Sequence, residues 1–167
     1  MFKKLLLAAL LLAPVSAMAQ KFGHYDGGIV ETLPEYKKAM TELEELGKGY
    51  QAELEEMQKE LQTRYEKFQK EMKPTTPQNV VQRKQKELED LQMRLQQASE
   101  DNSKAFQEAQ QQKMQPILVK VQDAVAAVAK EGGYLFVLDK RQSNAQFYIN
   151  ETISEDVTSK LKAKLGL

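Results

Sequence analysis

The sequence predicts a mostly α-helical protein with a small β part, in which a long antiparallel coiled-coil hairpin is joined to a small body built from both chain ends. Charged residues make up 29% of the chain, aromatic residues only 7%, and Trp is absent, which is typical of long helices rather than of a packed globule. Two polar stretches, residues 35–73 and 78–114, carry apolar residues at alternating spacings of three and four. Between them, the Pro-Thr-Thr-Pro segment 74–77 cannot continue a helix.

The N-terminus predicts a secretory signal peptide over residues 1–19. Lys3 and Lys4 form a basic region, residues 5–14 are an apolar run, and Ala17–Ala19 fit the small-x-small cleavage rule. The run is too short to span a bilayer, which disfavours the alternative of a membrane-anchored N-terminus. We expect export, cleavage after Ala19 and a mature chain with 22 basic residues, that is 24 less two lysines, against 24 acidic ones.

The expected body begins directly after the signal peptide. Residues 22–25 predict a short strand, and Gly27-Gly28 predicts a turn. Thr32 and Glu35 have the spacing of a capping box, which places the start of the first long helix near residue 33.

Apolar residues in the two long stretches occupy about two positions in seven, which is the seam of a coiled coil and too narrow for the core of a globule. Several seam positions are instead polar or glycine. A polar seam residue lowers stability while it fixes the register. Two interpretations stay open: a hairpin that keeps its pairing but bends readily, or ordinary imperfections without a functional consequence. The positions concerned are Gly47, Arg64, Glu71, Lys84, Asn102 and Gln112.

Basic residues gather near the expected turn of the hairpin. One interpretation is a basic tip that makes transient contact with anionic groups, such as the head groups of a membrane surface or acidic segments of a partner. The alternative is a solvated charged end, since acidic residues are interspersed. Nucleic acid is not expected as a partner, because the mature chain is not basic. The basic residues are Lys67, Lys70, Lys73, Arg83, Lys84 and Lys86.

The pattern changes at Pro116, which is expected to end or kink the second long helix. A wider apolar stripe over residues 117–128 predicts a short helix that packs against a core, and Gly132-Gly133 stops it. The continuous apolar run 134–138 predicts a buried strand.

The last part of the chain predicts a polar loop over residues 139–144 and a half-buried strand over 146–150. Thr152 and Glu155 predict a second capping box before a final helix. A two-stranded hairpin is marginal in water and strand edges need partners, so the body is expected to oligomerise. The apolar face of the final helix comprises Val157, Leu161 and Leu165.

The expected organisation is therefore a signal peptide at 1–19, an oligomerisation body at 20–34 and 117–167, and a helical hairpin at 35–116 with its tip at 74–77. Catalytic motifs are absent from the sequence: it contains no GxxxxGK[ST], no HExxH and no GxSxG pattern. There is no Cys, and the single histidine, His24, is expected to pack among aromatic residues. We expect no catalytic residue, no cofactor and no metal.

Both ends of the mature chain resemble the Skp/OmpH-like family of periplasmic chaperones. The resemblance rests on the opening FGHYDGGIVETLPEYKKA and on the ending GGYLFVLDKRQSNAQFYINETISEDVTSKL, with Leu138-Asp139, Tyr148-Ile149 and Asp156-Val157-Thr158 at the matching places. It implies a homotrimer with a small intersubunit β-barrel body and three helical hairpins around a cavity. It also implies an ATP-independent holdase for unfolded outer-membrane proteins. The best-known members are markedly basic, and this chain is not.

Soft or amphipathic side chains on the hairpin are candidates for contacts with such clients, because these surfaces adapt to varied partners. The alternative, favoured for those in the seam, is that they pack the hairpin. A different function remains open as well, namely a structural coiled-coil spacer or adaptor of the cell envelope that binds a fixed partner. The candidate client-binding residues are Tyr50, Tyr65, Phe68, Met72 and Met93.

Overall fold

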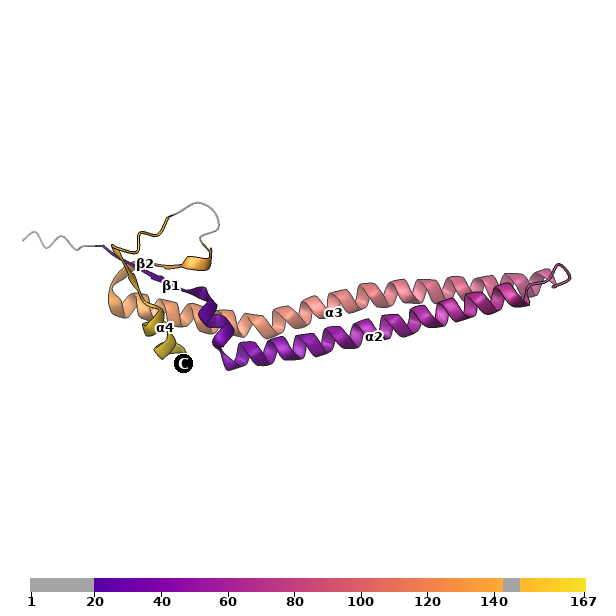
Figure 1. Cartoon of the computed structure of the whole chain (residues 1–167), viewed down its shortest axis with the longest axis horizontal. Helices are drawn as coiled ribbons and strands as arrows, with labels where there is room; N and C mark the ends of the chain where they lie inside the picture. The colour runs from indigo at the N-terminus through magenta and orange to yellow at the C-terminus, as the bar shows by residue number, and fades with distance from the viewer. Residues whose placement is uncertain (1–19, 143–147) are drawn as a thin grey trace, which may run out of the picture. The chain divides into compact units, whose positions relative to one another are not determined.

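The computed structural model describes residues 20–142 and 148–167, and it is mostly helical with a small strand part near the chain ends (Figure 1), which confirms the predicted fold class. The predicted signal peptide and residues 143–147 lie outside the described residues. In chain order the elements are β1 (Lys21–Tyr25), η1 (Gly27–Thr32), α2 (Pro34–Glu71), α3 (Gln78–Gly132), β2 (Tyr134–Asp139), η2 (Lys140–Gln142), β3 (Ser154–Asp156) and α4 (Thr158–Leu165).

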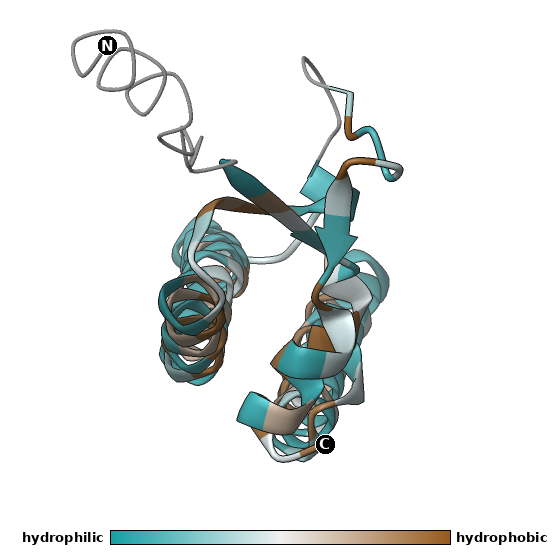
Figure 2. Ribbon diagram, turned by 90° about the vertical axis from the view of Figure 1, so that its left-hand side faces the viewer, coloured by the Kyte–Doolittle hydropathy of each residue, from teal (hydrophilic) through white to brown (hydrophobic). Residues whose placement is uncertain are grey.

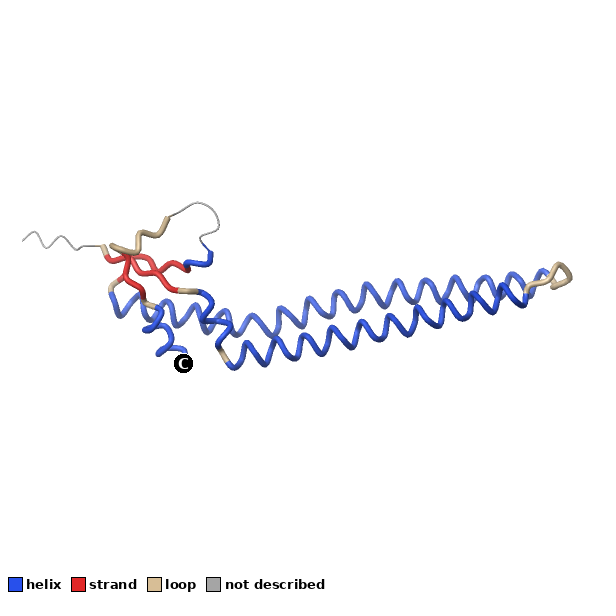
Figure 3. Tube along the Cα trace, in the orientation of Figure 1, coloured by secondary structure: helices blue, strands red, loops and turns tan. Residues whose placement is uncertain are grey.

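The chain divides into two compact units. The hairpin unit, Val30–Val121, holds α2 and most of α3. The sheet unit holds the described residues up to Ile29 together with Gln122–Leu167, and so contains the three strands and α4. The continuous helix α3 contributes residues to both units (Figure 3).

The first long helix begins at Pro34, close to the predicted position, but the expected capping box does not form. Its N-cap is Leu33 rather than Thr32, and within the described residues no side chain caps it. Proline has no amide hydrogen, so Pro34 leaves no unsatisfied donor at the first helical position. Leu33 is fully buried, and its packing therefore fixes where the helix begins. At the other end, Met72 donates its backbone N–H to the carbonyl of Phe68.

The expectation that Pro116 ends the second long helix is wrong, whereas a kink at this residue stays a prediction. Helix α3 continues through Pro116 as far as Gly132, and the predicted short helix is its last part. Proline removes one helical hydrogen bond, but the residues that follow offset this loss by burying apolar surface. Packing therefore overrides the local preference at this position. The buried residues that follow are Ile117, Val121, Ala124 and Val128.

The three strands form a parallel sheet in the order β2-β1-β3, with β1 in the centre. Phe22 pairs with Phe136 on one side of β1 and with Ser154 on the other. The predicted pair of neighbouring strands over 134–150 is therefore wrong, because β2 and β3 each pair with β1 instead. Residues 148–150 are not strand, and the third strand begins at Ser154.

The second predicted capping box is also absent from the described residues. The Asn150 side-chain oxygen accepts hydrogen bonds from the Thr152 backbone N–H at 3.0 Å and from its hydroxyl at 2.7 Å, which closes a turn. Helix α4 starts later, at Thr158, whose backbone N–H donates to the Asp156 carboxylate at 2.9 Å. The predicted Thr152–Glu155 pattern thus belongs to a turn. The Asp156 carboxylate instead accepts a hydrogen bond from the first residue of α4.

The core of the sheet unit lies between the sheet and α4. Val157 and Leu161 are completely buried there, and Leu165 nearly so. His24 is buried as predicted, with its ring Nδ1 2.9 Å from the Ser154 hydroxyl. The predicted buried strand is only half confirmed: of its apolar residues, Tyr134 is buried, whereas Leu135 and Phe136 are 52% and 56% exposed. One face of β2 is therefore open in the single chain.

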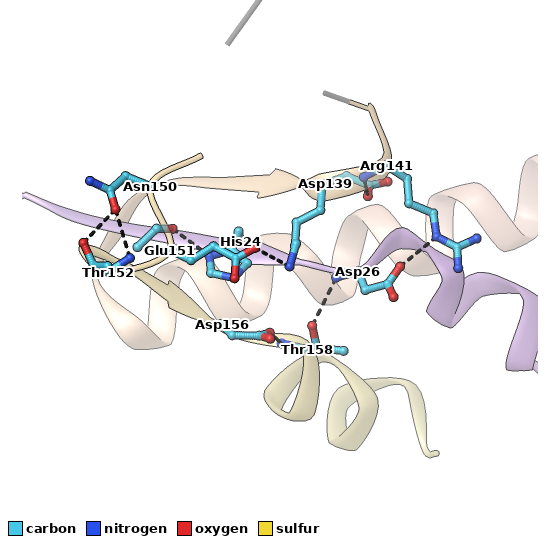
Figure 4. A network of polar contacts seen from close by, with 11 residues as sticks. His24, Asp26, Asp139, Arg141, Asn150, Glu151, Thr152, Asp156 and Thr158 are labelled. Atoms are coloured by element: carbon cyan, nitrogen blue, oxygen red, sulfur yellow. Dashed lines mark hydrogen bonds and ion pairs between the residues drawn. The ribbon is translucent and has the colours of Figure 1, made fainter. Parts of the chain in front are cut away.

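A polar network holds the turn after β1 (Figure 4). Asp139 Oδ1 accepts hydrogen bonds from the backbone N–H groups of Gly27 and Arg141, both at 2.9 Å. The Arg141 Nε donates to Asp26 Oδ1 at 2.8 Å, as Figure 4 shows. A hydrogen bond from the Gly28 backbone N–H and the Arg141 side chain together lower the pKa of the Asp26 carboxyl. This network ties the end of β2 to the start of η1.

Replacing Gly27 by alanine is expected to destabilise the sheet unit by about 2 kcal/mol. A Cβ at this position would lie 2.1 Å from Asp139 Oδ2, and two backbone donors hold that carboxylate in place. Urea unfolding at fixed protein concentration measures the loss. The double variant Gly27→Ala with Asp139→Ala should be less destabilised than the sum of its single variants, because the clash is removed. Additive losses would contradict this account.

Candidate functional site

The two helices of the hairpin keep one antiparallel register along their whole length. Four polar contacts cross between α2 and α3, and in each the two residue numbers add up to 155. Three of the polar seam residues, Glu71, Lys84 and Asn102, take part in these contacts, and their role in setting the register stays a prediction. The contacts are Glu35–Lys120 at 2.6 Å, Glu42–Lys113, Glu53–Asn102 at 3.0 Å and Glu71–Lys84 at 2.9 Å.

Lysine partners lower the pKa of three glutamates in these contacts, Glu35, Glu42 and Glu71, through side-chain hydrogen bonds. Their pKa in the unfolded chain is near 4.5, so this stabilisation is fully present above 4.5 and is lost as the pH falls through the lower folded values. We expect the unfolding temperature of the hairpin, followed by circular dichroism, to fall on acidification below about pH 4.5. The triple Glu→Gln variant should show a flatter pH dependence, and an unchanged dependence would contradict the assignment.

The seam of the hairpin remains accessible. Near its base Ala39 and Leu43 are buried, but none of the described residues from 44 to 116 is. In a hairpin of two helices, each seam residue is covered by the opposite helix on one side only. Both long helices, α2 and α3, are also largely hydrophilic (Figure 2). The seam side chains therefore contact the opposite helix and also face solvent. The half-buried leucines are Leu54, Leu61, Leu88, Leu91 and Leu95.

Two grooves between the helices share Gln58 and follow one another along the same side of the hairpin. We call their lining the neutral face, because its charged residues are two glutamates, Glu55 and Glu89, with no lysine or arginine among the lining residues. The larger groove has a volume of about 620 Å³. The other lining residues are Gly47, Tyr50, Gln51, Leu54, Leu61, Gln62, Tyr65, Leu88, Gln92, Ser99, Asn102, Ser103, Phe106 and Gln107.

A third groove defines the charged face, in which nine of the thirteen lining residues are charged. On α2, three lining residues of the neutral face each come one residue after a seam position, namely Gln51, Gln58 and Tyr65. Two lining residues of the charged face each come one residue before a seam position, namely Glu56 and Thr63. At about 3.6 residues per turn, these two sets point to opposite sides of the seam. The charged residues are Glu56, Lys59, Glu60, Arg64, Lys67, Lys84, Glu87, Asp90 and Arg94.

The structure separates the five candidate client-binding residues. Tyr50 and Tyr65 lie on the neutral face, and Tyr65 is 53% exposed. Phe68 lines the charged face. Met72 is the C-cap of α2, and Met93 is 61% exposed on α3 without lining any of the three grooves. Binding by any of the five stays a prediction.

Sequence reasoning missed Phe106, which lies in the neutral face opposite Gly47. A Cβ built on Gly47 would meet the Phe106 ring at 3.5 Å, which is ordinary contact. The signal was present in the sequence, because a glycine in the seam leaves space on the facing helix. It became readable only once the register of the two helices was known.

The basic tip is partly neutralised. Glu71 forms ion pairs with Lys84 at 2.9 Å and Lys67 at 3.8 Å, and Glu87 pairs with Arg83 at 3.9 Å. Contact of the tip with lipid head groups stays a prediction. Among the six basic residues of the tip, those for which the described part of the chain offers no ion pair are Lys70, Lys73 and Lys86.

Neither metal binding nor a membrane span is indicated by the described residues. Residues 20–142 and 148–167 contain no cluster of three or more His, Cys, Asp or Glu side chains that would hold a metal ion. In the same ranges no helix combines the length and the apolar character that a bilayer span requires.

Comparison with known proteins identifies the family. The family model "Outer membrane protein (OmpH-like)" matches residues 21–165. A search among curated proteins finds no match. The family consists of periplasmic chaperones rather than enzymes, which agrees with the resemblance of the two chain ends. The matched range contains the hairpin and all three described strands, so the chain belongs to the OmpH-like family.

Proposed function

We propose that this protein is an ATP-independent holdase of the periplasm that binds unfolded outer-membrane proteins along its hairpin and prevents their aggregation. The family supports a chaperone-type function for outer-membrane proteins. The observation that carries the proposal is the open seam: between residues 44 and 116 no described side chain is buried, so apolar surface is offered to a partner along most of the hairpin.

The physical basis of holding is the match between this surface and an unfolded client. Unfolded outer-membrane strands expose apolar side chains and unpaired backbone groups, which otherwise aggregate through their edges. Several hairpins around one client supply many weak contacts at high effective concentration. Release needs no nucleotide, because a client that folds into the membrane buries the surface that was held.

The sheet unit supports assembly into a homo-oligomer, which we propose to be a trimer. Phe22 stacks on Phe136 with ring centroids 6.2 Å apart, yet both rings remain partly exposed, and Leu135 and Ile153 are exposed as well. Among the described residues, β2 and β3 each pair with β1 alone. An apolar sheet face and two strand edges together favour burial against further copies.

Replacing Phe136 by aspartate is expected to convert the oligomer into monomers, because it places a charge on the apolar face of the sheet. Light scattering of the mature protein measures the mass. Met93→Asp, at an exposed position of the hairpin, serves as the matched control and should keep the parent mass. An unchanged mass for the Phe136 variant would place assembly elsewhere on the chain.

The holdase proposal is tested by diluting several unrelated outer-membrane proteins from urea in the presence of the mature protein without ATP. Aggregation should be suppressed at about stoichiometric ratio for each of them. Binding of one fixed partner, with no effect on aggregation, would instead favour a structural spacer or adaptor of the envelope. The single register along the hairpin suits that second function, since it gives the hairpin a defined length.

A further inference from the structure

The two sides of the hairpin offer different chemistry to a client. The neutral face places Tyr50, Tyr65 and Phe106 among amides and hydroxyls, with two glutamates as its only charges among the lining residues. The charged face surrounds Phe68 with nine charged side chains. An apolar segment that docked on the charged face would desolvate charged groups, and this costs far more than desolvating amides.

We infer that the neutral face is the surface that takes the client, and that its occupant is an extended, uncharged segment of the length of one transmembrane β-strand. This inference rests on the proposed holdase function and specifies where and how the client binds. It selects one side of each hairpin, whereas the open seam by itself allows both.

The length of the neutral face supports this occupant. On α2 it runs from Gly47 to Tyr65, which at 1.5 Å per residue is about 27 Å. An extended chain rises about 3.3 Å per residue, so about eight or nine residues cover this distance. A transmembrane β-strand has about nine to eleven residues. A strand at the short end of this range, about nine residues, therefore fits along the face without reaching the charged tip.

Charge and hydrogen bonding agree with the same occupant. The lipid-facing positions of an outer-membrane strand are apolar, with aromatic residues near both ends, and charged residues there are unfavourable. Tyr50, Tyr65 and Phe106 provide aromatic surface for such side chains. The amides of Gln51 and Gln58 both donate and accept hydrogen bonds, which suits the unpaired N–H and C=O groups of an unfolded strand.

Site-specific photo-cross-linking distinguishes the two sides. Gln58 is shared by both neutral grooves, and Thr63 lines the charged one; both side chains are exposed on α2 near the middle of the hairpin. Benzoylphenylalanine is placed at either position in the full mature chain. The probe is an eight-stranded outer-membrane protein diluted from urea. We expect cross-linking to the probe to be about fivefold higher from position 58 than from 63.

A charge inserted on each side provides an independent measurement. Gln58→Lys should raise the dissociation constant for the same probe about tenfold, since the ammonium group is placed against apolar client surface. The matched variant Thr63→Lys joins side chains that are already charged and should change the constant by less than about twofold. Both positions are exposed, so both variants should unfold at the parent temperature.

Several results would overturn the inference. Equal yields from the two positions, or a higher yield from position 63, would remove the preference for the neutral face. A cross-link from position 58 to another copy of the chain, formed without the probe and unchanged by it, would mean that a second copy covers this face. If the parent protein suppresses aggregation in these cases, only the inference fails. If it does not suppress aggregation, the holdase function fails as well.

Discussion

A protein with a shortened hairpin is expected to lose client holding while it keeps its oligomeric state. Deleting residues 50–70 together with 85–105 removes three heptads from each helix and preserves the register, because the residue numbers on both sides of the new junctions, 49 with 106 and 71 with 84, still add up to 155. The deletion removes most of the neutral and charged faces but leaves the sheet unit intact. We expect the capacity to suppress aggregation to fall at least about tenfold, since multivalent contacts are lost together.

A smaller deletion serves as the matched control for this variant. Removing residues 57–63 together with 92–98 takes out one heptad from each helix in the same register, and it should lower the holding capacity only in part. Circular dichroism and light scattering check that both proteins stay helical and keep the parent mass. If the shortest protein held clients as well as the parent, the holding surface would have to lie outside the deleted segments, in the sheet unit or in the remaining base and tip of the hairpin.

Replacing Leu161 by alanine is expected to destabilise the sheet unit by about 3 kcal/mol. The side chain is 0% exposed in α4, so its truncation removes buried apolar surface and leaves a cavity beside Val157. Urea unfolding is measured at one fixed protein concentration, because assembly contributes to the apparent stability. The oligomer should dissociate at lower urea concentration than the parent does.

Leu118→Ala is the control for the Leu161 substitution. Leu118 also lies in a helix but is 46% exposed, and alanine is a good helix former, so the expected change is below about 0.5 kcal/mol. A similar loss for both variants would show that burial in the single chain does not determine the stability of this unit.

The long helices could be predicted because their evidence is local. The heptad spacing and the Pro-Thr-Thr-Pro break lie within each segment, so both ends of α2 and the start of α3 lie close to the predicted positions. Pro116 was misjudged because its cost is local, whereas the compensation comes from burial of residues one to three turns later. The sheet was misjudged because strand order depends on pairing between distant segments. The short polar strand β3 has no apolar pattern that would reveal it.

The candidate site could be predicted only in outline. Heptad columns identify which residues lie near the seam, but they do not say which residues share an open side. That assignment needs the register, and the register became known from contacts such as Glu53–Asn102. The sequence alone therefore groups Tyr50 and Tyr65 with Phe68, whereas the structure places Phe68 among the charged side chains.

The parallel pairing of β1 with β2 has a consequence for the order of folding. Lys21 pairs with Tyr134, so β1 and β2 cannot pair before the chain has been made at least as far as residue 134. The helices between them can zip together earlier, starting at their short turn, because those contacts are close in sequence. Zipping brings Glu35 to Lys120 and so shortens the loop that sheet formation has to close. Early formation of the hairpin therefore lowers the entropic cost of forming the sheet in the same chain.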